Sequence, residues 1–212
     1  MEDFYKDIKP VEIARPKGAR QIEAFSPKLG RRLRFYNWST FRLWLLLEAD
    51  PGVRVFCERP GYLQTSTSTL LAAFWARYDD RREILLLAPS GDAVEVRCSG
   101  AETFLDATVP VRVVDSTELA AARVWTDNWE RMLPLITANK KLLSSTLCDG
   151  IVRFVSLATQ LCTIERTFST GDPILVRAAV LSLLHAGGLC APTLHTAPLS
   201  PMTPFLPTEG GS

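Results

Sequence analysis

The chain has 212 residues, 47% of them hydrophobic, and a formal net charge of +1. This composition excludes a mainly disordered chain and provides enough apolar surface for one large or two small globular domains.

The sequence also predicts a cytoplasmic protein without a membrane passage. The acidic start, Met1-Glu2-Asp3, has no apolar run behind it, as a secretory signal would need. The richest late apolar stretch, 174–190, is short for a bilayer span and is interrupted by Arg177 and His185. The five cysteines are widely spaced and lack Cys-x-x-Cys pairs, so we expect free thiols and no metal or redox site. They are Cys57, Cys98, Cys148, Cys162 and Cys190.

The first third of the chain predicts an arm, a helix and a strand. Residues 1–30 show no sustained periodicity, which is typical of a loosely attached N-terminal arm. From Tyr36 the apolar spacing predicts a helix that ends at Asp50-Pro51-Gly52. Alternation then predicts a strand over 53–58, which Pro60-Gly61 ends.

The next segment predicts a β-hairpin and a later strand. Residues 65–69 are β-prone and 70–78 continue as a strand, which turns at 79–82 into a returning strand over 84–87. A further strand is expected over 109–114. A helix over 92–107 would make its pairing parallel through a crossover connection. Residues 92–98 also alternate between apolar and polar residues, so a strand is the alternative to this helix.

Beyond Ser116 the pattern turns helical. One helix is expected to start at Ser116, and a second is expected over 125–136 with an interruption near Pro134. An amphipathic segment is expected over 148–162. Asp172-Pro173 predicts a capped helix start, and Gly187-Gly188 its end. The order of helix, short helix and longer helix resembles a small all-α winged-helix module. The proline-rich tail, 191–212, is expected to be extended or disordered.

Positively charged residues are concentrated in the segment 20–42, where Glu23 is the one acidic residue. Such a segment predicts either a surface that faces DNA phosphates or a solvated basic arm. The candidate DNA-binding residues are Arg20, Lys28, Arg31, Arg32, Arg34 and Arg42. Trp38 lies near these basic residues and is a candidate for contact with nucleic acid.

Four stretches resemble, in order and spacing, the TnsA-type transposon endonucleases of the PD-(D/E)XK nuclease fold. They are 26–31, 45–60, 110–119 and 198–201. The resemblance implies an α/β chain with an arm over 1–30, a restriction-endonuclease-like mixed sheet flanked by helices over 31–118, a winged-helix-like module over 119–190 and a tail over 191–212.

The resemblance also locates the catalytic positions of the family. Its helix glutamate falls on Thr40, its strand aspartate on Ala73, and its Glu-x-Lys pair on Leu86 and Ala88. None of these side chains can hold a divalent cation, which needs several oxygen ligands. The chain therefore resembles a catalytically degenerate member that has no metal cofactor.

The implied function is that of a non-catalytic subunit of a DNA transposition complex. Such a subunit would dock on the transposase and its ATPase regulator and help to hold double-stranded transposon-end DNA. The expected helix over 172–186 offers Arg177 alone for base readout, which favours protein binding by that module.

Two alternatives stay open. An active Mg²⁺-dependent endonuclease could use relocated ligands at Asp80, Asp92 and Glu95, although arginine at 97 would poorly replace the family's lysine. A third possibility is an interaction or regulatory protein that has kept the fold and left transposition.

Overall fold

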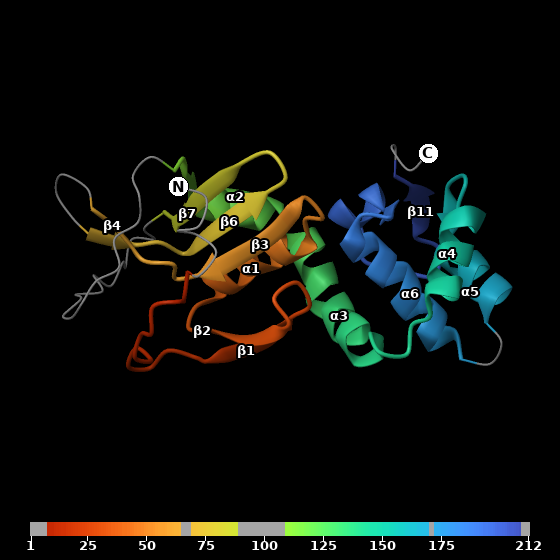
Figure 1. Cartoon of the computed structure of the whole chain (residues 1–212), viewed down its shortest axis with the longest axis horizontal. Helices are drawn as coiled ribbons and strands as arrows, with labels where there is room; N and C mark the ends of the chain where they lie inside the picture. The colour runs from red at the N-terminus through yellow and green to blue at the C-terminus, as the bar shows by residue number, and fades with distance from the viewer. Residues whose placement is uncertain (1–7, 65–68, 89–108, 170–171, 209–212) are drawn as a thin grey trace. The chain divides into compact units, whose positions relative to one another are not determined.

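The computed structural model describes residues 8–64, 69–88, 109–169 and 172–208, and it is a mixed α/β structure (Figure 1). The chain divides into two compact units. The first contains 1–24, 32–47 and 52–120, and the second contains 25–31, 48–51 and 121–212. Among the described helices, none combines the length and the hydrophobicity needed to span a bilayer.

The first unit is built on a mixed four-stranded sheet. Its strands are β3 (Val53–Glu58), β6 (Phe74–Tyr78), β7 (Arg82–Leu87) and β8 (Val111–Val114), in the order β3-β6-β7-β8. The β6–β7 hairpin is antiparallel and β7–β8 is parallel, which confirms both predicted pairings. The helix expected over 92–107 lies outside the described residues.

Helix α1 (Trp38–Ala49) packs its aromatic side chains beside this sheet. Asn37 caps it, because its Oδ1 accepts the Thr40 N–H at 2.7 Å. The ring of Phe35, at the end of β2 (Arg31–Phe35), lies 5.5 Å from Trp44 of α1 and 6.5 Å from Phe74 of β6. The apolar face that the spacing predicted is therefore buried over the Phe74 face of the sheet.

The strand expected over 70–78 is two strands. β5 (Thr69–Leu71) pairs with β4 (Tyr62–Gln64), whereas β6 pairs with β3 and β7. The chain changes sheets at Ala72 and Ala73, and this change of partner is why one continuous strand was the wrong expectation.

The arm expected over 1–30 is wrong over 22–30, whereas the described residues 8–21 form no helix or strand. Strands β1 (Ile22–Ser26) and β2 (Arg31–Phe35) form a two-stranded sheet. Arg59, which has a φ of 47°, holds the segment before β1 close to β2. Its Nε donates to the Val11 carbonyl at 3.0 Å and its Nη1 donates to the Arg34 carbonyl at 3.0 Å. These bonds join segments far apart in sequence, so local periodicity did not predict them.

Helix α2 (Ser116–Ala121) leads from the first unit to the second. The described part of the second unit contains four α-helices and a small sheet, so the expectation of an all-α module is wrong. The helices are α3 (Arg123–Asn139), α4 (Ser145–Phe154), α5 (Leu161–Phe168) and α6 (Pro173–Ala186). The sheet has the order β10-β11-β9 and is antiparallel. Its strands are β9 (Thr159–Gln160), β10 (Leu189–Cys190) and β11 (Pro204–Pro207).

The proline-rich tail is part of the core of this unit. After β10 the 3₁₀ helix η1 (Pro192–His195) buries Leu194 completely, and β11 buries Phe205 completely. The apolar contacts of these two side chains hold the described tail in place. The tail therefore contributes its own structure to the second unit.

Two helix predictions also need correction. Helix α3 continues through Pro134, where both Pro134 and Glu130 are exposed, so water can bond the carbonyl that proline leaves unpaired. The amphipathic segment over 148–162 is two helices, α4 and α5. They are separate because β9, which lies between them, pairs with β11.

The predicted ends of α6 are confirmed. Asp172 Oδ1 accepts the Ile174 N–H at 2.8 Å, and Pro173 occupies the first turn. Gly187 ends the helix with a φ of 80°.

Replacing Gly187 tests this end of the helix. A Cβ on Gly187 would lie 2.9 Å from Pro51 Cβ, and its φ is strained for any L side chain. We expect Gly187→Ala to lower the free energy of unfolding by about 2 kcal/mol, measured by urea denaturation. Gly188→Ala is the matched control, because its φ is ordinary and its Cβ would lie 3.4 Å from Leu183 Cδ2. Equal losses in the two variants would contradict the role of Gly187.

Candidate functional site

The structure brings three of the four family positions together at one end of the β6–β7 hairpin. The Ala73 N–H donates to the Leu85 carbonyl at 2.9 Å, one residue from Leu86. The Ala88 N–H donates to the Val114 carbonyl at 2.8 Å. Carboxylates on two neighbouring strands could converge here, but the side chains present are methyl and isobutyl groups.

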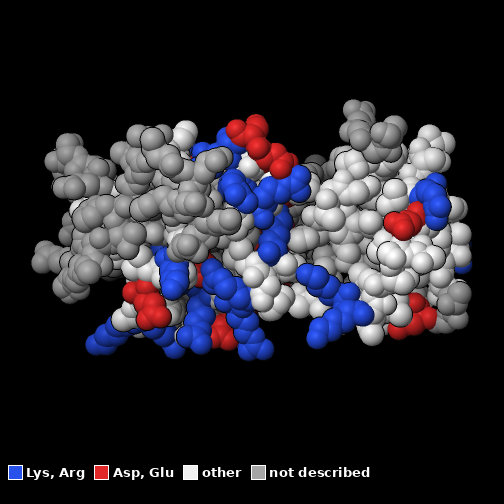
Figure 2. All heavy atoms as spheres, in the orientation of Figure 1, with Lys and Arg blue, Asp and Glu red and all other residues white. Residues whose placement is uncertain are grey.

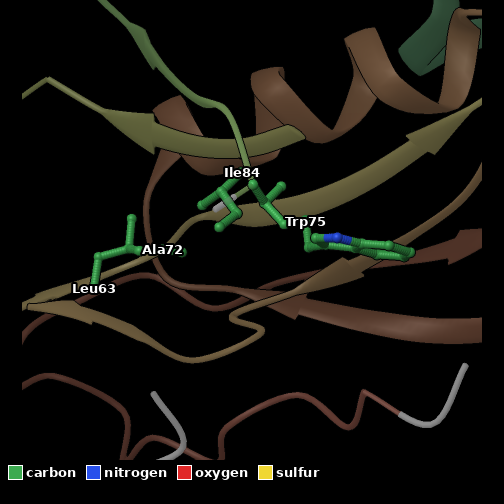
Figure 3. Close-up of a cluster of buried hydrophobic side chains, with 5 residues drawn as sticks. Leu63, Ala72, Trp75 and Ile84 are labelled. Atoms are coloured by element: carbon green, nitrogen blue, oxygen red, sulfur yellow. The ribbon is translucent and has the colours of Figure 1, made fainter. Parts of the chain in front are cut away.

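A hydrophobic cluster fills the same face of the hairpin (Figure 3). Trp75 and Ile84 are opposite each other across β6 and β7, and both are buried. Leu86 packs against this cluster. The complete cluster is Leu63, Ala72, Trp75, Ile84 and Val109. The described side chains of this cluster carry no oxygen atom that could act as a ligand for a divalent cation.

Thr40, the fourth family position, lies in the first turn of α1. Its Oγ1 donates to Asn37 Oδ1 at 2.8 Å, beside the backbone bond that caps the helix. The hydroxyl therefore supports the helix start, and the position has no carboxylate.

Two buried carboxylates in this sheet were missed by sequence reasoning, and both lie on its other face. Glu58 is opposite Phe74 and Glu83 is opposite Ala76, whereas Trp75 and Ile84 form a pair on the face of the hydrophobic cluster. Glu83 accepts a hydrogen bond from the Tyr78 hydroxyl at 2.5 Å. Their sequence signal was weak, because Glu58 ends its strand and Glu83 follows Arg82, where an acidic residue is also typical of an exposed strand end.

The relocated metal site stays a prediction. Asp80 is exposed in the β6–β7 turn and lies 3.4 Å from Arg81, while Asp92 and Glu95 are outside the described residues. Asp79 makes a two-pronged ion pair with Arg54 at 2.6 and 2.7 Å, and this bond lowers the pKa of Asp79. Within the described ranges, no three His, Cys, Asp or Glu side chains are grouped so as to hold a metal ion.

The first unit presents a basic surface that we call the basic ribbon, defined by Arg20, Arg32 and Arg34. On β2 the exposed Arg32 and Arg34 alternate with the buried Leu33 and Phe35. Lys and Arg side chains gather in Figure 2 where Figure 1 shows β1 and β2.

Two of the three arginines of the basic ribbon contact neighbouring side chains. The guanidinium of Arg20 lies 6.0 Å from the centre of the Trp38 ring, and Trp38 is 47% exposed. Arg34 pairs with Glu23 at 3.1 Å. Arg15 and Lys17, which sequence reasoning did not select, are exposed in the segment before β1.

The other three predicted DNA-binding residues have different surroundings. Lys28 and Arg31 belong to the second unit, where the Lys28 ammonium donates to the Asp50 carbonyl. Arg31 and Arg42 are half-buried. The structure therefore assembles half of the predicted set on the exposed ribbon.

No family model and no curated protein matches the chain. The resemblance to TnsA-type endonucleases therefore stays a prediction.

Glu48 of the second unit is a polar centre that sequence reasoning missed. It is fully buried at the end of α1 and accepts hydrogen bonds from Ser26 Oγ at 2.5 Å and from the Lys28 N–H at 3.0 Å. His185 Nε2 lies 3.0 Å from its Oε1. The three partners come from two segments far from Glu48 in the chain, 26–28 and 185, so the sequence signal was limited to an acidic residue near the end of a leucine-rich helix.

Proposed function

We propose that this chain is a non-catalytic, TnsA-like subunit of a DNA transposition complex. It holds double-stranded transposon-end DNA and docks on the transposase and its ATPase regulator. The observation that carries the proposal is the hairpin end at Ala73, Leu86 and Ala88, where three positions that the resemblance assigns to the metal site lie together and carry only hydrocarbon side chains.

The strand order supports a restriction-endonuclease-like fold. An antiparallel hairpin, β6–β7, is followed by the parallel strand β8, and α1 packs on the Phe74 face. That arrangement is the one the resemblance implies for a PD-(D/E)XK core. It would leave the opposite face of the hairpin for the metal site of an active relative.

The second unit supports a winged-helix-like module with a docking role. Helix α4, strand β9, helices α5 and α6, and strands β10 and β11 follow one another in the winged-helix order. Residues 187–208, which include the loop before β11, contain no Lys or Arg. A wing that contacts DNA normally needs such cations for phosphates, so this module suits a protein partner.

A nicking assay tests the loss of catalysis. The purified chain is incubated with supercoiled plasmid and Mg²⁺ or Mn²⁺, with and without the cognate transposase. We expect no metal-dependent nicking by the chain alone, because Ala73, Leu86 and Ala88 offer no metal ligand.

The relocated site gives the opposite result in the same assay. Metal-dependent nicking that Asp80→Asn or Glu95→Gln abolishes would overturn the proposal and establish an active endonuclease. Absence of DNA affinity at low salt would instead favour an interaction protein outside transposition.

A further inference from the structure

A cavity of about 200 Å³ lies between α3 and α6 in the second unit. Its apolar wall consists of Met132 and Leu135 from α3, Leu181 from α6, and Leu199 from the segment before β11. Asn128 lies on the same face of α3 as Arg131 and Met132, because residues three and four positions apart are neighbours on a helix surface. One helix face therefore supplies both the apolar and the polar parts of the wall.

The amide of Asn128 is used entirely within the unit. Its Nδ2 donates to the carbonyls of Leu194 and Ala197 at 2.8 and 2.9 Å, and its Oδ1 accepts the Leu199 N–H at 2.9 Å. These three bonds hold the segment that carries Leu199 against α3. The cavity wall is thus preformed, which lowers the entropy cost of binding a ligand.

Two arginines give the cavity a positive rim. Arg177 Nε donates to Glu165 Oε1 at 2.6 Å, and this bond raises the pKa of Arg177. Arg131 is exposed, and the described part of the chain gives it no hydrogen bond or ion pair. Because Glu165 balances only one of the two cations, the rim keeps a net positive charge.

The size and chemistry of the cavity select a class of ligand. Pockets for small molecules and cofactors usually measure about 300–1,000 Å³, so this one suits a single anchoring side chain. Among the described residues, the apolar part of the lining contains no aromatic side chain on which a nucleic-acid base would stack. An apolar floor beside an unpaired arginine matches an apolar side chain next to a carboxylate.

We propose that the α3–α6 cavity binds a short segment of a partner protein that combines an apolar anchor residue with a neighbouring Asp or Glu. The anchor enters the space between Met132, Leu135 and Leu181, and the carboxylate pairs with Arg131. This inference depends on the residues of the second unit alone, so it stands or fails separately from the proposed holding of DNA.

A peptide selection on the full chain tests the inference. The probe is a random 12-residue library displayed on phage, and enriched sequences are synthesised with a fluorescent label for anisotropy measurements. We expect them to place Leu, Met or Phe within four residues of Asp or Glu. Arg131→Glu should weaken their binding about tenfold or more, because a like charge then faces the carboxylate.

Lys140→Glu is the charge-matched control, since Lys140 is an exposed cation just after α3 that does not line the cavity. It should change the dissociation constant less than twofold. The inference is overturned if no peptide is enriched, if enriched peptides lack acidic residues, or if Arg131→Glu leaves their affinity unchanged. Loss of duplex-DNA affinity in Arg131→Glu, with peptide binding intact, would assign Arg131 to phosphate contact instead.

Discussion

Glu48→Ala is expected to lower the free energy of unfolding of the second unit by about 3–5 kcal/mol, the loss typical when one partner of a buried polar pair is removed. Glu48 is fully buried, and its two oxygens accept from Ser26 Oγ and the Lys28 N–H. Alanine would leave these donors and His185 without their acceptor, in a space that the shorter side chain also leaves unfilled. Urea denaturation followed by tryptophan fluorescence measures the loss, because Trp129 lies 5.7 Å from the His185 ring.

Two further variants separate the lost hydrogen bonds from the lost charge. Glu48→Gln keeps one acceptor oxygen and nearly the same volume, so we expect an intermediate loss. Glu23→Ala removes an exposed carboxylate that pairs with Arg34 and should cost no more than about 0.5 kcal/mol. If Glu48→Ala were as stable as Glu23→Ala, the buried network would not contribute to the fold as the geometry indicates.

The elements predicted from sequence are those whose signals are local. Asp172-Pro173 and Gly187 mark the two ends of α6 within one short stretch, and the Asp79–Arg82 turn joins two strands that pair with each other. Each of these signals acts between residues close in the chain. Local capping and turn chemistry therefore determined them without tertiary information.

The elements that were missed depend on partners far away in the chain. Strand β9 has two residues and pairs with β11 more than forty residues later, so neither periodicity nor length indicates it. Arg59, which has a φ of 47°, forms hydrogen bonds with Val11 and Arg34, which lie 48 and 25 residues away in the chain. No pattern within a short window records such bonds.

The candidate site was predictable in its placement and less so in its surroundings. The strand register brings Ala73 beside Leu86, and this register follows from the turn at 79–82, which the sequence predicted. The covering of this face by Leu63 and Val109 depends on strand β4 and on the segment before β8. Residue 109 lay within the strand expected over 109–114, whereas strand β4 was not predicted from sequence.

Removing the basic ribbon is the second change for which we expect a large effect. The variant Arg20→Ala/Arg32→Ala/Arg34→Ala should bind duplex DNA about 10- to 100-fold more weakly at moderate salt. Arg32 and Arg34 lie two residues apart on one exposed face of β2, so both can contact the same groove, and a two-stranded ribbon fits the major groove of B-DNA. Fluorescence anisotropy with a labelled duplex measures the affinity.

The salt dependence distinguishes phosphate contacts from a structural effect. Each phosphate contact that is lost should lower the slope of log K against log salt concentration by about 0.9, so the triple variant should show a visibly flatter line. A control variant, Arg123→Ala/Arg153→Ala/Arg166→Ala, removes the same charge from exposed positions of the second unit and should keep the original slope. An equal fall in both variants would mean that net charge, and not the ribbon, governs binding.

Glu23 supplies a test of the opposite sign. Its carboxylate lies 3.1 Å from Arg34 Nε and therefore competes with a phosphate for that guanidinium. Glu23→Gln should release Arg34 and raise DNA affinity about two- to fivefold, mainly at low salt where surface charges are least screened. A DNA-holding role for the ribbon requires both results, because the same arginine must lose affinity when it is removed and gain it when its competitor is neutralised. Unchanged affinity in the triple variant would leave the basic ribbon as a solvated surface and remove the DNA contact from the proposed function.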